Sequence, residues 1–331
     1  MRFVRFLTIT LAALIATLAL VDVGVRAAFP VLPRLEANFS AAYLARTIDR
    51  GDLAKRVVFL GDSVLWGYRL HASETATERL ARRGVRVANV AFEGGSIANT
   101  YAMLRLMAHR GVMPRAVVFN VNVKEFNAAD SAYRTLYPAV EALAWEYLTP
   151  DERTLLKRTH RDTMDAAIDR VLSRWWGLYG MRSDIRELLF GQADATTAVQ
   201  TLLGEASGRN ARTEAAHRPT AARFLGTYDL TPLSNDNVEV IFLRKTVVLL
   251  AAMKVPAIAI LTPTNHALLH EYIDVPDYED QLRYVRASLG PNVRVLDYDR
   301  AFTSGEFIDN DHLTAEGNHR LAGMLFSVLP R

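Results

Sequence analysis

Residues 57–67, VVFLGDSVLWG, lead an apolar run directly into Gly-Asp-Ser and then into a second apolar stretch. The run Val57–Leu60 is typical of a short strand buried on both faces, and the glycine after it favours a sharp turn. Ser63 stands at the bend where a helix is expected to begin. A turn of this kind exposes a hydroxyl and unpaired backbone N–H groups at the edge of a sheet. Ser63 is therefore either a nucleophile or a helix N-cap.

Strand-like and helix-like segments alternate on both sides of a long middle section. This alternation is typical of βαβ units and predicts one three-layer α/β domain with about five parallel strands. Further strands are expected at 85–90, 114–123, 256–263 and 293–299, and helices at 72–83, 96–111, 238–254, 278–289 and from about 314.

The middle section, residues 128–236, is predicted to be a helical insertion on the sheet, because it shows no alternating strand pattern. Thr149–Glu152 reads TPDE, a capping box with proline at the first helical position, so a helix should begin there and carry residues 153–176. Trp175 and Trp176 could stack on a sugar ring or pack within the insertion.

The N-terminus combines basic residues with an apolar run. Arg2 and Arg5 precede Phe6–Val21, an uncharged stretch that reaches membrane-spanning length if it extends to Val25. A signal anchor is the favoured interpretation, and a signal peptide cleaved near Ala28 is the alternative. The body should then lie outside the cytoplasm, as a single-pass protein of the inner membrane with a periplasmic domain. The expected layout is 1–28 anchor, 29–55 linker and 56–331 catalytic domain.

Composition excludes several classes of function. The net charge of +3 over 331 residues is small and the arginines are dispersed, which argues against nucleic acid as the main partner. The sequence has no cysteine, so disulfides, thiolate metal sites and a cysteine nucleophile are excluded. His266 and His270 have the spacing of two metal ligands on one helix, but no third ligand is evident, so no metal site is predicted.

A second stretch that could carry chemistry lies near the C-terminus, where residues 307–325 read FIDNDHLTAEGNHRLAGML. Asp309 could hold one imidazole nitrogen of His312 while the other nitrogen faces Ser63. Taken alone, an Asp–His pair in a loop is more often ordinary surface chemistry. However, the carboxyl ends of parallel strands meet at one edge of a sheet, so this pair and Ser63 should come together.

The two end motifs, GDS and DNDHLTAEGN, together resemble the SGNH (GDSL-type) hydrolase superfamily over residues 56–125 and 238–331. The resemblance implies a flavodoxin-like α/β/α sandwich and an esterase or acyltransferase activity without a metal or organic cofactor. It also implies Ser63 as nucleophile, His312 as general base and Asp309 as its orienting partner.

The resemblance further implies an oxyanion hole, a set of donors for the negative oxygen of the tetrahedral intermediate. Ser63 N–H and Gly94 N–H are the expected donors, with Gly95 as the alternative to Gly94. The chain departs from the family after the third strand, where FNVNVKEFN replaces the usual Gly-x-Asn-Asp turn. Register favours Asn122 over Asn120 as the donor from this segment.

The irregular third segment, the N-terminal anchor and the insertion are similar to membrane-anchored members of the family. Those members O-acylate extracellular polymers, as in alginate O-acetylation and D-alanine transfer to teichoic acid, together with a multispanning membrane-bound O-acyltransferase. The resemblance implies a cell-envelope glycan or acyl ester as substrate, with Asn265 and Asp62 as candidate substrate-binding residues. For Asn265, a turn or cap role is the alternative.

The sequence thus predicts an extracytoplasmic serine acyltransferase or esterase that acts on the acyl esters of a cell-envelope or exported polysaccharide. The acyl group is expected to be acetyl. One alternative is a periplasmic esterase or lipase with water as acceptor. The other is a non-catalytic glycan-binding subunit of an acylation complex.

Overall fold

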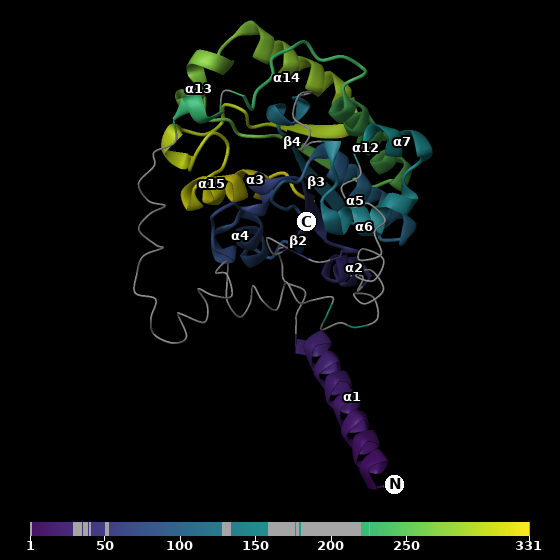
Figure 1. Cartoon of the computed structure of the whole chain (residues 1–331). Helices are drawn as coiled ribbons and strands as arrows, with labels where there is room; N and C mark the ends of the chain where they lie inside the picture. Colours follow the sequence, from purple (N-terminus) through teal and green to yellow (C-terminus); the bar gives the residue numbers. More distant parts are fainter. Residues whose placement is uncertain are drawn as a thin grey trace.

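The architecture is a five-stranded parallel sheet between two layers of helices (Figure 1). The computed structural model describes residues 2–28, 35, 39, 41–49, 53–127, 134–157, 176, 179, 220–224 and 226–330. The strand order is β2-β1-β3-β4-β5, with every neighbouring pair parallel. This is a doubly wound order with a switch point between β1 and β3, and it confirms the predicted α/β fold with five parallel strands. The strands are β1 (Val57–Leu60), β2 (Val87–Asn89), β3 (Ala116–Val121), β4 (Ala257–Leu261) and β5 (Val293–Asp297).

The central strands β1, β3 and β4 are buried on both faces, which explains why they read as nearly continuous apolar runs. Val58 and Leu60 of β1 belong to the core beneath α5 (Ile97–His109) and α12 (Val238–Met253). Val57 and Phe59 point the other way, into the core beneath helices α4 (Ala76–Arg82) and α15 (Ala315–Phe326). The remaining elements are α1 (Arg2–Ala28), α2 (Ala41–Asp49), α3 (Ser63–Trp66), η1 (Ala72–Glu74), η2 (Val123–Phe126), α6 (Pro138–Ala144), η4 (Trp145–Tyr147), α7 (Pro150–Leu155), η5 (Ala221–Phe224), α13 (His266–Ile273), α14 (Pro276–Leu289) and η6 (Ser304–Glu306).

Two segments differ from the sequence prediction. Part of the expected linker forms α2, whose Leu44 and Ile48 are buried in the core beside α6. The capping box of Thr149 and Glu152 does start α7, but this helix ends at Leu155 instead of continuing to residue 176. Its end coincides with an extended Leu156 and a bridge between strand-like residues 135 and 157. Most of the predicted insertion, including residue 175, lies outside the described residues.

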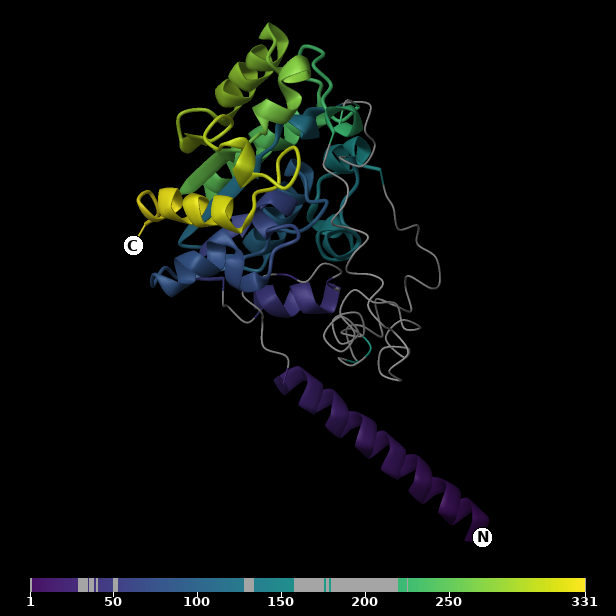
Figure 2. The same ribbon diagram turned by 90° about the vertical axis from the view of Figure 1, so that its left-hand side faces the viewer.

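The N-terminal helix α1 extends away from the rest of the molecule in both views (Figures 1 and 2). Large apolar side chains between Phe6 and Val23 are exposed along it. Over the described residues, no helix meets the length and apolarity needed to cross a membrane, so the predicted transmembrane segment is not confirmed.

Candidate active site

The turn after β1 places Ser63 at the carboxyl edge of the sheet. Asp62 is the N-cap of the short helix α3, and its Oδ1 accepts a hydrogen bond from Val64 N at 2.8 Å. Asn120 of β3 supports the turn, because its Oδ1 accepts a hydrogen bond from Asp62 N at 3.1 Å. Ser63 is the first residue of α3, so its hydroxyl lies where the chain changes direction.

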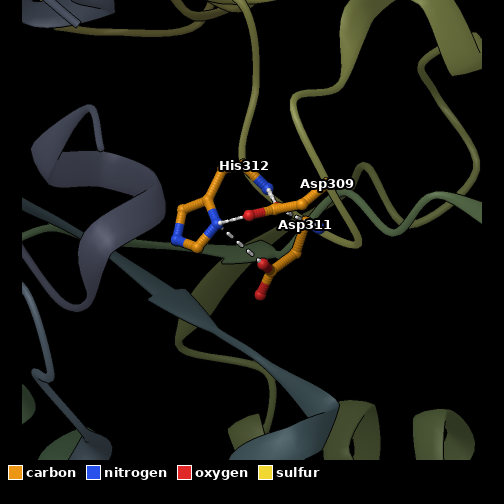
Figure 3. Close-up of side chains that lie close together, drawn as sticks. All are labelled: Asp309, Asp311 and His312. Atoms are coloured by element: carbon orange, nitrogen blue, oxygen red, sulfur yellow. Dashed lines mark hydrogen bonds and ion pairs between the residues drawn. The ribbon is translucent and has the colours of Figure 1, made fainter. Parts of the chain in front are cut away.

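The loop between β5 and α15 brings a histidine to this hydroxyl. His312 Nε2 lies 2.7 Å from Ser63 Oγ. On the other side of the ring, Nδ1 lies 2.8 and 2.9 Å from the two carboxylate oxygens of Asp309 (Figure 3). The structure thus brings together the three residues of the predicted triad, in the order and at the distances needed to move a proton from serine to imidazole.

The two titratable members of the triad affect each other. Burial lowers the pKa of His312, but the charge of Asp311 and the hydrogen bond and charge of Asp309 outweigh it, so this pKa is raised above its ordinary value. Burial raises the pKa of Asp309, yet the hydrogen bonds and charge of His312 bring it below the ordinary value. Asp309 is therefore ionised at neutral pH and stabilises an imidazolium.

Asn265 holds the loop of Asp309 and His312 from the neighbouring strand end. Its backbone N–H donates to Asn310 O at 2.8 Å and its Nδ2 donates to Asp309 O at 3.0 Å. Its Oδ1 caps α13 by accepting from Leu268 N at 3.3 Å. These contacts match the turn-and-cap alternative and give Asn265 a positioning role instead of the predicted substrate contact.

The contacts of Asp62 also serve the structure of the turn. The residue is buried, its Oδ1 caps α3, and its Oδ2 accepts a hydrogen bond from Asn122 Nδ2 at 3.2 Å. Both carboxylate oxygens are occupied by donors of the protein, so the predicted role in binding substrate does not fit this geometry.

Two backbone donors remain for an oxyanion hole. Among the described residues, neither Ser63 N–H nor Gly94 N–H has a hydrogen-bond acceptor, whereas Gly95 N–H donates to Phe92 O at 3.1 Å. A Cβ on Gly95 would lie 2.2 Å from Gly61 O, which shows how closely this loop packs on the serine turn. The contacts favour Gly94 over Gly95 as the second donor.

The side-chain amide of Asn122 already donates hydrogen bonds to two carboxylates. Its Nδ2 donates to Asp62 Oδ2 at 3.2 Å and to Asp311 Oδ2 at 2.7 Å. Both N–H bonds are thereby directed at carboxylates, so the predicted third oxyanion donor is not free in this structure. Asp311 and its ion-pair partner Lys124 were missed as site residues. The available signals were the second aspartate in DND and a lysine where the family has its Asn-Asp turn.

The histidine and aspartate clusters are explained without a metal ion. Asp309, Asp311 and His312 are close enough to share a cation, but their donor atoms already pair with one another and with Lys124. His266 uses both ring nitrogens, lying 2.7 Å from Asp274 Oδ1 and 2.8 Å from Asp299 Oδ2.

Comparison with known proteins adds little to this description. No family model matches the chain, and no curated protein matches it. One similar solved structure is described as a lipolytic protein of the G-D-S-L family from Desulfitobacterium hafniense DCB-2, with 11% identity and a TM-score of 0.38. The match covers 83% of this chain and 99% of that one. A likeness this distant does not bear on the function of the site.

Proposed function

We propose that the protein is an SGNH-type serine esterase or acyltransferase. The observation that carries the proposal is the continuous contact from Ser63 Oγ to His312 Nε2 at 2.7 Å and from His312 Nδ1 to Asp309 at 2.8 Å. This arrangement activates a hydroxyl for attack on an ester carbonyl.

The reaction follows from these contacts. His312 Nε2 takes the proton of Ser63 as Oγ bonds to the carbonyl carbon, and Ser63 N–H and Gly94 N–H receive the negative oxygen. His312 then gives the proton to the leaving alcohol oxygen as the ester bond breaks, which leaves an acyl group on Ser63. An incoming hydroxyl then loses its proton to His312 and attacks the acyl carbon, and as the bond from that carbon to Ser63 Oγ breaks, His312 returns the proton to Oγ and restores the free serine.

The proposed substrates are acyl esters of a cell-envelope glycan, with acetyl as the expected group. The proposal includes an anchor in the inner membrane through α1, a periplasmic body and a multispanning O-acyltransferase as partner. It is supported by the exposed apolar side chains of α1, by the arginines before them and by the likeness of the end motifs to membrane-anchored family members.

The nucleophile is tested by the Ser63→Ala variant with p-nitrophenyl acetate. Turnover should fall by at least about 10³-fold, because the variant cannot form an acyl-enzyme. Ser327→Ala is the matched control, since this exposed hydroxyl bonds, among the described residues, only to Met324 O in the last turn of α15. Undiminished turnover in Ser63→Ala would refute the assignment.

The acceptor is tested with a labelled acetyl donor and uronic or neutral glycans. Label that reaches the glycan only when Ser63 is present supports the transferase, whereas label released as free acetate supports the esterase with water as acceptor.

Because Asn122 is not free as a donor, a non-catalytic glycan-binding subunit is the second candidate. Glycan binding without covalent labelling of Ser63 by a fluorophosphonate would favour that candidate.

A further inference from the structure

A second carboxylate, Asp311, lies beside the imidazole of His312. Figure 3 shows Asp309 and Asp311 approaching the same ring nitrogen from two sides, and Asp311 Oδ1 lies 3.3 Å from His312 Nδ1. The side chain of Asp311 is 0% exposed, while that of His312 is 13% exposed. Asp311 Oδ1 accepts no hydrogen bond from the described residues, and it faces the imidazole of His312.

The other oxygen of Asp311 is fully engaged. Oδ2 accepts a hydrogen bond from Asn122 Nδ2 at 2.7 Å and forms an ion pair with Lys124 Nζ. The lysine side chain is 14% exposed, so most of this pair is shielded from water. Burying a carboxylate without a nearby cation is costly, and the lysine supplies that cation.

This division of the two oxygens suits the chemistry of the triad. Lys124 and Asn122 neutralise one oxygen, and the second faces the ring on which positive charge develops during proton transfer. The inference rests on the proposed serine chemistry. We propose that Asp311, which is paired with Lys124, is a second carboxylate partner of His312 and acts as a positioning residue that stabilises the imidazolium formed when Ser63 loses its proton.

The surrounding charges are consistent with this role. The charge of Asp311 is the strongest of the influences that raise the pKa of His312, and it acts against burial. Lys124 opposes it from η2, and the pKa of Tyr228 is raised by burial and by Asp311, so that phenol is neutral. The groups that face the cluster directly are Asp309 and Asp311 on the loop, Lys124 on η2, and the ring of Tyr68, which lies 4.4 Å from that of His312. Asp62, before α3, is linked to the cluster by its hydrogen bond with Asn122. Tyr228 is linked to it by its hydrogen bond with Asn310.

The test is the pH profile of kcat/KM for Asp311→Asn with p-nitrophenyl acetate. The acidic limb should move down by about one pH unit, because an anion that favours the protonated imidazole has been removed. At neutral pH, kcat should fall by about 10- to 100-fold with KM nearly unchanged, since the contact matters in the transition state. An acidic limb and kcat equal to those of the wild type overturn the inference.

The matched control is Asp299→Asn. Asp299 is another buried aspartate, and its carboxylate bonds to His266 at 2.8 Å and to Tyr278 at 2.6 Å instead of to a residue of the triad. Its loss should lower the melting temperature without moving the acidic limb, which separates a structural effect from a positioning one.

Fluorophosphonate labelling of Ser63 in the wild type completes the design. A labelled, active wild type with an unchanged Asp311→Asn profile refutes only the role of Asp311, whereas a wild type without label or turnover refutes the proposed function and this inference together.

Lys124→Met and the double variant with Asp311→Asn test the role of the lysine. If Lys124 acts through Asp311, the fold-losses of the two single variants will not multiply in the double variant. Multiplying losses would overturn that part of the proposal. The double variant also removes both buried charges, so its pH profile provides the test if Asp311→Asn alone does not fold.

Discussion

At the scale of single residues, Gly61 shows how tightly the serine turn is built. Its φ of +136° lies in a region that side chains rarely adopt. A Cβ there would lie 1.9 Å from Asn120 Oδ1, the atom that accepts the hydrogen bond from Asp62 N. The amide of Asn120 thus occupies the space of the missing side chain and fixes the backbone just before the nucleophile.

Gly61→Ala should therefore lower the free energy of unfolding by about 2–5 kcal/mol, through backbone strain and displacement of Asn120. Gly84→Ala is the matched control, because Gly84 also has a positive φ, +84°, but open space where a Cβ would lie. That variant should lose only about 1 kcal/mol from strain. Urea unfolding measures both, and equal losses would contradict the steric argument.

Some residues of the site can be predicted from the sequence, and the contacts of others cannot. Ser63, His312 and Asp309 could be found because a strand end and a short Asp–His spacing restrict them locally. The hydrogen bonds of Asn122 and Asp62 could not be predicted, since they join the end of β3, the serine turn and the last loop. The bonded residues lie 60 and 189 positions apart in the sequence. A motif names the residue types there, but only the fold decides which donor meets which carboxylate.

At the scale of elements, two buried acids tie three helices together. Glu125 Oε2 accepts from Ile97 N at 2.9 Å, and Glu239 Oε2 accepts from Ala98 N at 3.1 Å. Both therefore satisfy free N–H groups at the start of α5, one from η2 and one from α12. Burial raises the pKa of Glu239 to about 8 and holds that of Glu125 well above its usual range.

This arrangement predicts a stability that falls as pH rises. The pKa of Glu239 in the folded state lies above its ordinary value of about 4.5, so its contribution is complete below that pH and is lost as pH rises through about 8. Glu239→Gln cannot ionise and keeps a carbonyl for Ala98 N–H. Its melting temperature should match that of the wild type near pH 5 and exceed it by several degrees at pH 9.

Thermal unfolding followed by circular dichroism across this range measures the difference. Glu271→Gln is the control, because this glutamate is 70% exposed and should not change the slope of melting temperature against pH. A constant offset between Glu239→Gln and the wild type at every pH would contradict the assignment.

The elements themselves were largely predictable. The central strands β1, β3 and β4 carry apolar runs because both of their faces are covered, and caps such as Thr149 and Thr314 mark helix starts locally. The helix α2 was missed because the prolines and polar residues around it indicated a linker. The length of α7 was overestimated because its end depends on the bridge between residues 135 and 157, which a periodic pattern does not reveal.

At the scale of the whole molecule, the Ser63–His312–Asp309 triad and α1 belong to separate parts. The segments after β1, β3, β4 and β5 meet at one edge of the sheet, where Ser63, His312 and Asp309 come together. The helix α1 extends away from this body, and its exposed apolar side chains belong to neither hydrophobic core (Figures 1 and 2). Removal of α1 should therefore change where the protein is found and not how it turns over substrate.

Deletion of residues 2–28 is the direct test of the proposed anchor, because it removes the apolar helix and leaves the sheet and its loops complete. Full-length protein expressed in a bacterium with its own export pathway should sediment with membranes and resist extraction by high salt. A body given a cleavable signal peptide in place of α1 should appear in the soluble periplasmic fraction. Its kcat for p-nitrophenyl acetate should lie within about twofold of the full-length value, since α1 contributes no contact to the triad.

The control keeps the length of α1 and changes only its polarity. Ile15→Asp with Leu18→Asp places two charges in the middle of the apolar run, which is costly in a bilayer and harmless in water. This variant should leave the salt-resistant membrane fraction as the deletion does. If the deletion and the charged variant both remain with the membranes, the body itself holds the protein there, and the proposed role of α1 is wrong.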